Sequence, residues 1–351
     1  MYPINAHNEW DPLEEMIVGI AEDAYFPTDD ISFKLSVDIK SALPNYQFTE
    51  LKLGAISQRV IEETHEDLET LVEVLEGQGI VVRRPQPHVN MNKIKTPYWE
   101  SDRYFTYCPR DIFLTVGDTI IETPNMQRSR YFESFCYEHL YVDYITRGGK
   151  WIAAPKPKLR DSDFNLCGTQ HSILKNREPI FEAANVMRAG RDLFYLLSDG
   201  ANELGAKWLQ NTLGNEYRVH LCKNLYSGLH MDSTIALLRP GLFLANPARV
   251  RPDNLPEPLK KWDMIYTPPM EDNEQSEIGY ISTVWLGMNL LVVNPHLAIV
   301  DAQQTALIKL LERNQFDVIP LTLRHARKLG GGFHCVTLDV RRKGQKEDYF
   351  S

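Results

Sequence analysis

The sequence has few cysteines, and their spacing predicts neither a metal site nor a disulfide framework. Five cysteines are an odd number, they are widely separated, and none forms a CxxC pair or stands with histidine at metal-ligand spacing. A free reactive thiol is compatible with this pattern, although a buried and inert cysteine is the commoner outcome for any one of them. The cysteines are Cys108, Cys136, Cys167, Cys222 and Cys335.

The chain also lacks dense basic runs and long apolar stretches. Acidic residues outnumber basic ones by 47 to 38, giving a net charge of −9, so we expect no nucleic-acid and no membrane partner. No apolar stretch approaches the roughly 18 residues of a membrane span, and the opening MYPINAHNEWDPLEE lacks the features of a signal peptide. We therefore expect a cytoplasmic protein. With 43% hydrophobic and 24% charged residues, the composition is that of a folded chain with a sizeable core.

A repeated order of helix, glycine stop and strand runs along the chain. Residues 57–76 place apolar side chains on one helical stripe, and Gly77, Gly79 and a strand-like IVVRRP follow. The stripe consists of Val60, Ile61, Leu68, Leu71, Val72 and Leu75. The same order returns at residues 132–155, 202–222 and 304–321, and more faintly at 258–269.

Hairpin-like pairs of strands separate these units. Their predicted turns are Gly117-Asp118, Pro240-Gly241 and Asn294-Pro295. Five units at a spacing of roughly 50 to 70 residues favour a ring-like α/β fold over the commoner doubly wound sheet, since no glycine-rich phosphate loop follows the first strand. No linker rich in Pro, Ser or Gly divides the chain, so we expect one domain over residues 1–351.

The most unusual local sequence is LGGGFHCVTLDVRR at residues 329–342. Three successive glycines permit positive φ angles and close approach of the backbone to a ligand, and they precede Cys335 at the entrance to a predicted strand. That position suits a thiol that lines a pocket, while His334, next to it in a strand, is expected to point to the opposite face. By itself a buried structural cysteine is more common than a nucleophile, and a base must come from elsewhere.

Three other segments supply titratable side chains. In HMDSTI, His230 and Asp232 would share one face of an extended segment, which makes a base and a carboxylate neighbours. Asp111 follows Pro-Arg at the start of an apolar strand, where a turn cap is the usual role. Glu182 is an acid in an apolar stretch, and such acids usually have a partner. Because a thiolate requires a nearby cation or base at neutral pH, these residues are candidates to activate Cys335.

Taken together, these segments resemble the amidinotransferase family, which includes glycine amidinotransferase and the inosamine-phosphate amidinotransferase of aminoglycoside biosynthesis. Nine blocks occur in the family's order between residues 8 and 342 and span nearly the whole chain, which is far more specific than any single motif. The blocks are NEWDPLEEMIVG, CPRDIFLTVGDTIIETP, RSRYFES, APKP, AANV, HMDSTI, RPGLFLANP, WLGMNLLVV and LGGGFHCVTLDVRR. The resemblance implies a five-bladed α/β propeller, the fold shared with arginine deiminases.

The same resemblance implies roles for individual residues. Cys335 matches the family's nucleophile, His230 its general acid/base, and Glu182 the acid that orients this histidine. Asp111 and Asp232 match carboxylates that hold the substrate guanidinium. The family has Asp at the position of Glu182, so the extra methylene must be absorbed if the carboxylate is to reach the imidazole.

Four further residues are assigned to the substrate site. Arg249 matches a residue that binds the arginine carboxylate, and Thr283 falls where related enzymes have a pocket serine. Leu229 and Ser227 stand just before the candidate base, so we expect them to line the acceptor entrance.

The resemblance implies transfer of the amidino group of L-arginine to an amine, through a covalent amidino-cysteine and with release of L-ornithine. This ping-pong reaction requires no metal or organic cofactor, and family members are often homodimers. Two alternatives stay open: an arginine deiminase-like hydrolase on the same fold, and a non-catalytic binding protein. The acceptor can be glycine, lysine, an aminocyclitol or a larger amine, although HMDSTI and NELGAKWLQ favour a bacterial natural-product enzyme of the inosamine-phosphate type.

Overall fold

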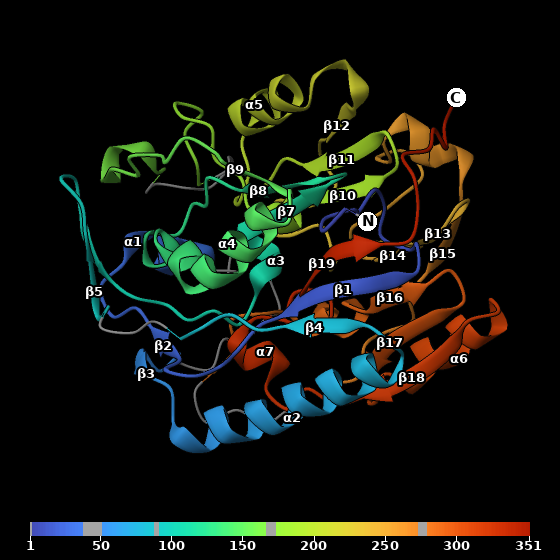
Figure 1. Cartoon of the computed structure of the whole chain (residues 1–351), viewed down its shortest axis with the longest axis horizontal. Helices are drawn as coiled ribbons and strands as arrows, with labels where there is room; N and C mark the ends of the chain where they lie inside the picture. The colour runs from blue at the N-terminus through green and yellow to red at the C-terminus, as the bar shows by residue number, and fades with distance from the viewer. Residues whose placement is uncertain (1, 38–50, 88–90, 166–172, 273–278) are drawn as a thin grey trace.

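The computed structural model describes residues 2–37, 51–87, 91–165, 173–272 and 279–351 of the 351-residue chain. Within these ranges the strands form small separate sheets instead of one continuous sheet (Figure 1). Five sheets have three strands each and two have two strands. The architecture is therefore mixed α/β with several small sheets, and the doubly wound alternative does not apply to the described residues.

The five three-stranded sheets share one pattern. Two neighbouring strands are antiparallel, the third strand runs parallel to the middle one, and a helix or 3-10 turn precedes that third strand. The sheets are β19 (Thr337–Arg342), β1 (Leu13–Val18) and β4 (Val81–Arg83); β7 (Phe113–Val116), β8 (Thr119–Glu122) and β9 (Lys150–Ala153); β10 (Val186–Ala189), β11 (Asp192–Leu196) and β12 (Arg218–Cys222); β13 (Ile235–Arg239), β14 (Leu242–Ala245) and β15 (Asp263–Tyr266); and β16 (Leu291–Asn294), β17 (Leu297–Asp301) and β18 (Asp317–Leu321).

The pairing of β19 with β1 joins the two ends of the chain in one sheet. In Figure 1 the blue β1 and the red β19 accordingly lie side by side. Helix α2 (Gln58–Gly77) runs along one side of this sheet, and α5 (Glu203–Leu213) lies on the opposite side of the molecule (Figure 1). The fold thus places β1, from near the N-terminus, beside β19, from near the C-terminus, in the middle of the molecule.

The helices that the periodicity predicts are present at four of the five expected places. They are α2, α4 (Glu138–Thr146), α5 and α6 (Thr305–Arg313). Along α2 the predicted stripe faces inward, with Leu68, Leu71 and Leu75 buried. The faint copy at 258–269 forms only a 3-10 turn, Glu257–Lys261, before β15.

Two of the three predicted hairpin turns, Gly117-Asp118 and Pro240-Gly241, are confirmed as two-residue connections. The flanking strand residues pair directly, Val116 with Thr119 and Arg239 with Leu242. In the third hairpin Asn294 ends β16 and pairs with Leu297, so the connection is Pro295-His296 instead of Asn294-Pro295. Gly117 and Gly241 have φ angles of +60° and +82°, a region that residues with a Cβ rarely adopt.

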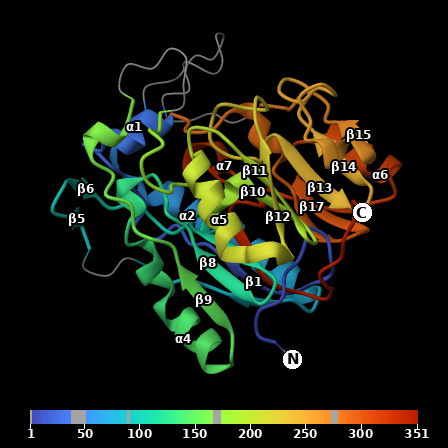
Figure 2. The same cartoon turned by 90° about the horizontal axis from the view of Figure 1, so that it is seen from above.

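The remaining elements are short. Two small hairpins and helix α1 lie together at the left of the molecule in Figure 1, and the helix is at the left in Figure 2 as well. Short turns connect the larger sheets. These elements are β2 (Tyr25–Phe26) with β3 (Gly54–Ala55), β5 (Lys93–Lys95) with β6 (Glu100–Asp102), α1 (Ile31–Val37), α3 (Pro109–Ile112), α7 (Ala326–Leu329), and the 3-10 turns Arg128–Arg130, Glu133–Tyr137, Asp161–Asp163, Ala183–Asn185, Gly214–Glu216 and Val284–Met288. Among the described residues no helix combines the length and apolarity needed to cross a membrane.

Candidate active site

Cys335 lies in a turn that leads into β19, close to Asp232 and Asn289. Its backbone N–H and that of His334 both donate to Oδ1 of Asn289, at 3.1 and 3.0 Å. Its Sγ lies 3.3 Å from Oδ2 of Asp232, and the thiol is also within hydrogen-bond reach of His230. One side-chain amide thus fixes the backbone that carries the thiol, and the thiol meets a histidine and a carboxylate from a distant part of the chain.

The glycine run before this turn is required by close packing. Gly330 adopts a φ of +84°, as the sequence predicts. A Cβ at Gly331 would overlap Sγ of Cys108, and one at Gly332 would come within 2.8 Å of the Asn289 side chain. The backbone therefore passes so close to its neighbours that only glycine fits at 331 and 332 without displacing them.

His230 lies between two carboxylates that come from other segments. Its Nε2 is 2.6 Å from Oε2 of Glu182, and its Nδ1 is 3.7 Å from Oδ1 of Asp111. Burial disfavours the imidazolium, but Asp111, the hydrogen bond to Cys335 and Glu182 together raise the pKa of His230 well above its ordinary value. The histidine is therefore set to carry a proton in the empty site.

The longer side chain of Glu182 is accommodated without losing the imidazole. Glu182 caps the 3-10 turn Ala183–Asn185 that leads into β10, and it is fully buried. Gly200 lies against it, since a Cβ at that position would be 3.2 Å from Oε2 of Glu182. The absence of a side chain at 200 leaves the room that the extra methylene needs.

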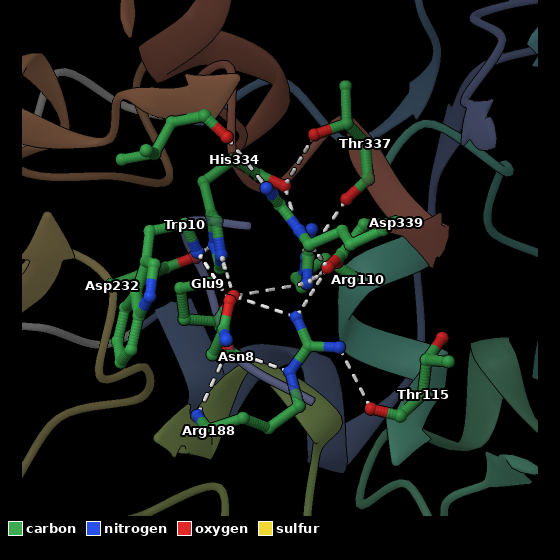
Figure 3. Close-up of polar contacts among 12 residues, drawn as sticks. Asn8, Glu9, Trp10, Arg110, Thr115, Arg188, Asp232, His334, Thr337 and Asp339 are labelled. Carbon is green, nitrogen blue, oxygen red and sulfur yellow. Dashed lines mark hydrogen bonds and ion pairs between the residues drawn. The ribbon is translucent and has the colours of Figure 1, made fainter. Parts of the chain in front are cut away.

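The expectation that His334 points away from Cys335 is wrong. Both residues lie in a turn, since β19 begins only at Thr337, so the alternation of a strand does not apply. Nδ1 of His334 lies 2.9 Å from Oδ2 of Asp232, the same oxygen that the Cys335 thiol contacts (Figure 3). Likewise, Asp232 belongs to a turn at 231–234 instead of an extended segment.

The pKa values of the Asp232 and Asp111 carboxyl groups are shifted in opposite directions. Burial disfavours the Asp232 carboxylate, but the hydrogen bond and charge of His334 lower its pKa to about 2. Burial raises the pKa of Asp111, although Arg130 holds its Oδ2 at 2.6 Å. Oδ1 of Asp111 is buried with no hydrogen-bond partner among the described residues. That oxygen is available to a bound cation.

Arg249 is a buried cation with no carboxylate partner within ion-pair distance among the described residues. Its guanidinium lies over the Tyr226 ring at 3.5 Å, and it donates to Ser233, to Thr234, and to Oγ1 of Thr283 at 3.4 Å. Burial lowers its pKa. Because a buried charge is costly unless it is paired, this arrangement favours binding of an anion.

The thiol of Cys335 is protonated in the empty site. Its hydrogen bond to Cys108, together with burial and the Asp232 charge, raises its pKa well above the ordinary value. The four described cysteines are all buried and free, and Cys167 lies outside the described residues. Activation of this thiol therefore requires a change that brings positive charge to the site.

One cavity collects most of the residues that the sequence singled out. Its volume is about 980 Å³ when the open solvent at its mouth is included. Glu182 lies behind His230 and does not line it, and Ser227 faces a neighbouring surface depression instead. The predicted residues on its wall are Asp111, Leu229, His230, Asp232, Arg249, Thr283 and Cys335.

Sequence reasoning missed several residues that hold this site together. Asn289, Arg130 and Glu133 are all buried, and Arg130 bridges Asp111 to Glu133 with a 2.5 Å bond from Nε. The signal available was their presence in WLGMNLLVV and RSRYFES, two of the blocks that carry the family resemblance but to which the sequence analysis assigned no chemical role. No group of three or more His, Cys, Asp or Glu side chains in the described part of the chain is arranged to hold a metal ion.

Comparison with known proteins identifies the family. No protein-family model matches the chain. The inosamine-phosphate amidinotransferase 1 of Streptomyces griseus is 49% identical over 99% of both chains. The chain belongs to the amidinotransferase family. Mitochondrial glycine amidinotransferase from Xenopus tropicalis is 38% identical over 99% of this chain and 85% of that protein. Amidinotransferase activity therefore follows for this member as well.

Solved structures give the same picture for this amidinotransferase. The inosamine-phosphate amidinotransferase StrB1 from S. griseus superposes over 100% of both chains with a TM-score of 0.94 and 49% identity. SxtG is an amidinotransferase from Microseira wollei in the saxitoxin biosynthetic pathway. Its structure superposes over 99% of this chain and 100% of SxtG, with a TM-score of 0.91 and 35% identity. DDAH from Pseudomonas aeruginosa superposes over 93% of this chain and 99% of DDAH, with a TM-score of 0.56 and 16% identity. This likeness shows a shared fold alone.

Proposed function

We propose that this amidinotransferase takes the amidino group from L-arginine, carries it on Cys335 and delivers it to an amine. The observation that carries the proposal is the charge pattern of the cavity. Asp232 contacts the thiol, Asp111 contacts His230, and both carboxylates line the same cavity as Arg249, a buried cation that has no carboxylate partner among the described residues. This pattern complements a guanidinium at one end of the ligand and a carboxylate at the other.

In the first half-reaction, the guanidinium enters between the two carboxylates. Its positive charge stabilises the thiolate that the empty site disfavours, so the thiol releases its proton to solvent as substrate binds. The sulfur of Cys335 attacks the central guanidinium carbon and forms an S–C bond. His230, which carries a proton at neutral pH, gives it to the departing nitrogen, the C–N bond breaks, and ornithine leaves.

In the second half-reaction, the acceptor amine takes the place of ornithine. His230 is now neutral and removes a proton from the attacking amine. The amine forms a bond to the amidino carbon, and the S–C bond breaks to leave the Cys335 thiolate. The thiolate takes up a proton from solvent when the cationic product departs. Glu182 keeps the imidazole in one orientation for both proton transfers because it holds Nε2 at 2.6 Å.

An intact-mass measurement after exposure to L-arginine without acceptor tests the proposal directly. The wild-type protein gains one amidino group, and peptide mapping locates it on Cys335. The Cys335→Ser variant does not gain this mass, whereas Cys222→Ser, which removes another buried thiol, gains it as the wild type does. Amidination that persists in Cys335→Ser would overturn the assignment of the nucleophile.

The products distinguish transfer from hydrolysis on the same fold. With arginine and an acceptor amine present, we expect ornithine to accumulate together with the amidinated amine. Citrulline as the main product would mean that water attacks, and the transferase proposal would then fail.

For the acceptor, we favour an amine of a bacterial biosynthetic pathway. This rests on two relatives, the inosamine-phosphate enzyme and SxtG in the saxitoxin pathway, and on a cavity that is open to solvent. A panel of glycine, lysine and phosphorylated or free aminocyclitols, compared by kcat/KM, tests this choice. A clear preference for glycine would contradict it.

We also infer that the five three-stranded sheets are the blades of one five-bladed propeller forming a single domain. Their shared strand pattern and the pairing of β1 with β19 support this inference. A crystal structure in which no common rotation relates one sheet to the next would refute it.

A further inference from the structure

His334 lies between two carboxylates that come from opposite directions. Its Nδ1 is 2.9 Å from Oδ2 of Asp232, and its Nε2 is 3.5 Å from Oε2 of Glu9 (Figure 3). The imidazole side chain is 10% exposed, and Glu9 and Asp232 are buried as well. Each ring nitrogen therefore faces a carboxylate oxygen away from bulk water.

Because each ring nitrogen of His334 faces a carboxylate oxygen, both nitrogens need a proton. A neutral imidazole carries a hydrogen on one nitrogen and a lone pair on the other, and only the charged form donates from both. A lone pair directed at a buried carboxylate is repulsive. We propose that His334 is an imidazolium bridge between Asp232 and Glu9, and that its charge allows Cys335 to become a thiolate beside Asp232.

The bridge matters because Cys335 and His334 share one oxygen. Sγ of Cys335 lies 3.3 Å from Oδ2 of Asp232, so a thiolate would form next to a carboxylate. Asp232 contributes to the raised pKa of the Cys335 thiol for this reason. A positive ring that donates to the same oxygen offsets the repulsion, and it does so from outside the cavity, since His334 does not line it.

The groups behind His334 balance its charge. Glu9 is held by Nε and Nη2 of Arg188, each at 2.8 Å, and Arg110 lies 3.8 Å away. Arg110, Arg188 and Arg342 converge on Asp339 at 2.6 to 2.7 Å. Nε of Arg110 also contacts the backbone carbonyl of His334, at 3.4 Å.

With His334 charged and Cys335 ionised, four cations face four anions in this buried cluster. Without the charge on His334, the thiolate would leave one negative charge in excess. His230, on the other side of Cys335, is bound to Glu182 and Asp111 and is committed to the proton transfers of the proposed reaction. The groups of the cluster are Arg110, Arg188, Arg342, His334, Asp232, Glu9, Asp339 and Cys335.

His334 is thus a positioning residue for the nucleophile, a role that rests on the proposed function of Cys335. The His334→Asn variant separates its charge from its hydrogen bond, because the Asn amide stands near the place of Nδ1 and can donate to Asp232 but is neutral. We expect the pH midpoint for iodoacetamide alkylation of Cys335 to rise, with a rate at neutral pH about tenfold lower, since one pKa unit corresponds to a factor of ten.

The matched control is His220→Asn in β12. Nε2 of His220 lies 2.6 Å from Asp192, so this histidine also contacts a carboxylate, but it does not line the cavity. Its variant should keep the wild-type alkylation profile. A wild-type profile in His334→Asn would overturn the proposal, because the hydrogen bond alone would then be sufficient.

A second measurement uses the wild-type protein and does not depend on the folding of any variant. In ¹⁵N-histidine-labelled protein at neutral pH, both ring nitrogens of His334 should have the shifts of protonated nitrogen. A ring with one unprotonated nitrogen would refute the bridge. Neither measurement requires arginine, so a failure here is distinct from a failure to amidinate Cys335 in the mass experiment.

Discussion

Glu182 and His230 form a 2.6 Å contact between a fully buried carboxylate and the candidate acid/base, although the family places a shorter Asp at position 182. The contact is possible because Gly200 leaves room beside the longer side chain. The departure that the sequence raised as a difficulty is therefore absorbed locally, and Glu182 reaches the imidazole without an intervening group.

Replacing Glu182 with Gln should impair catalysis more than substrate binding. Loss of the negative charge lowers the pKa of His230, so the fraction able to donate a proton falls and the alkaline limb of the rate profile moves to lower pH. We expect kcat to fall by roughly 10² to 10⁴ with little change in KM for arginine. The measurement is the pH dependence of ornithine release, with exposed Glu203→Gln as control. An unchanged profile would mean that Glu182 does not act through His230.

Removing the cation at Arg249 should change substrate selectivity. In Arg249→Leu we expect kcat/KM for arginine to fall about 10- to 100-fold, because a charge-assisted hydrogen bond to the substrate carboxylate is lost. Agmatine, which lacks the carboxylate, should be affected far less. Arg251→Leu removes an exposed arginine two residues away and should leave both substrates unchanged. Equal losses for arginine and agmatine would contradict a carboxylate-binding role.

A methyl group at Gly331 should displace the nucleophile. Since a Cβ there overlaps Sγ of Cys108, we expect Gly331→Ala to lose activity and about 1 to 3 kcal/mol of unfolding free energy. The double variant with Cys108→Ala, which removes that sulfur, should recover part of both. Gly77→Ala, where a Cβ meets nothing within 4 Å, is the control. Denaturant unfolding and ornithine release measure the two effects, and an absence of rescue would place the clash elsewhere.

Asp232 should make stability sensitive to acid. Its pKa is about 2 in the folded protein and about 3.8 ordinarily, so the carboxylate stabilises the fold above about pH 4 and this contribution is lost as the pH falls toward 2. The integrated difference is on the order of 2 kcal/mol. In Asp232→Asn that pH dependence should disappear, whereas exposed Asp253→Asn should retain it. Unfolding free energies measured from pH 2 to 7 test this; equal slopes in all three proteins would be the contrary result.

Much of the local structure follows from the sequence alone. Apolar spacing along 57–76 and glycine at 117 and 241 dictate a helix and two tight turns, because periodicity and positive φ are properties of a few neighbouring residues. The ordered blocks also led to side chains that lie together, since Asp111, His230, Asp232, Arg249 and Cys335 all line one cavity.

Tertiary structure decided how those side chains face one another. The contacts of Asp232 with His334 and Cys335 join residues 102 and 103 positions apart, and no local pattern encodes such a distance. His334 was misjudged because its orientation depends on a turn fixed by Asn289, which a strand rule does not include. Ser227 is next to Gly228 in sequence, yet it faces away from the cavity that Gly228 lines. Sequence periodicity reports which side of an element is buried, whereas the identity of the opposing group depends on how distant elements pack.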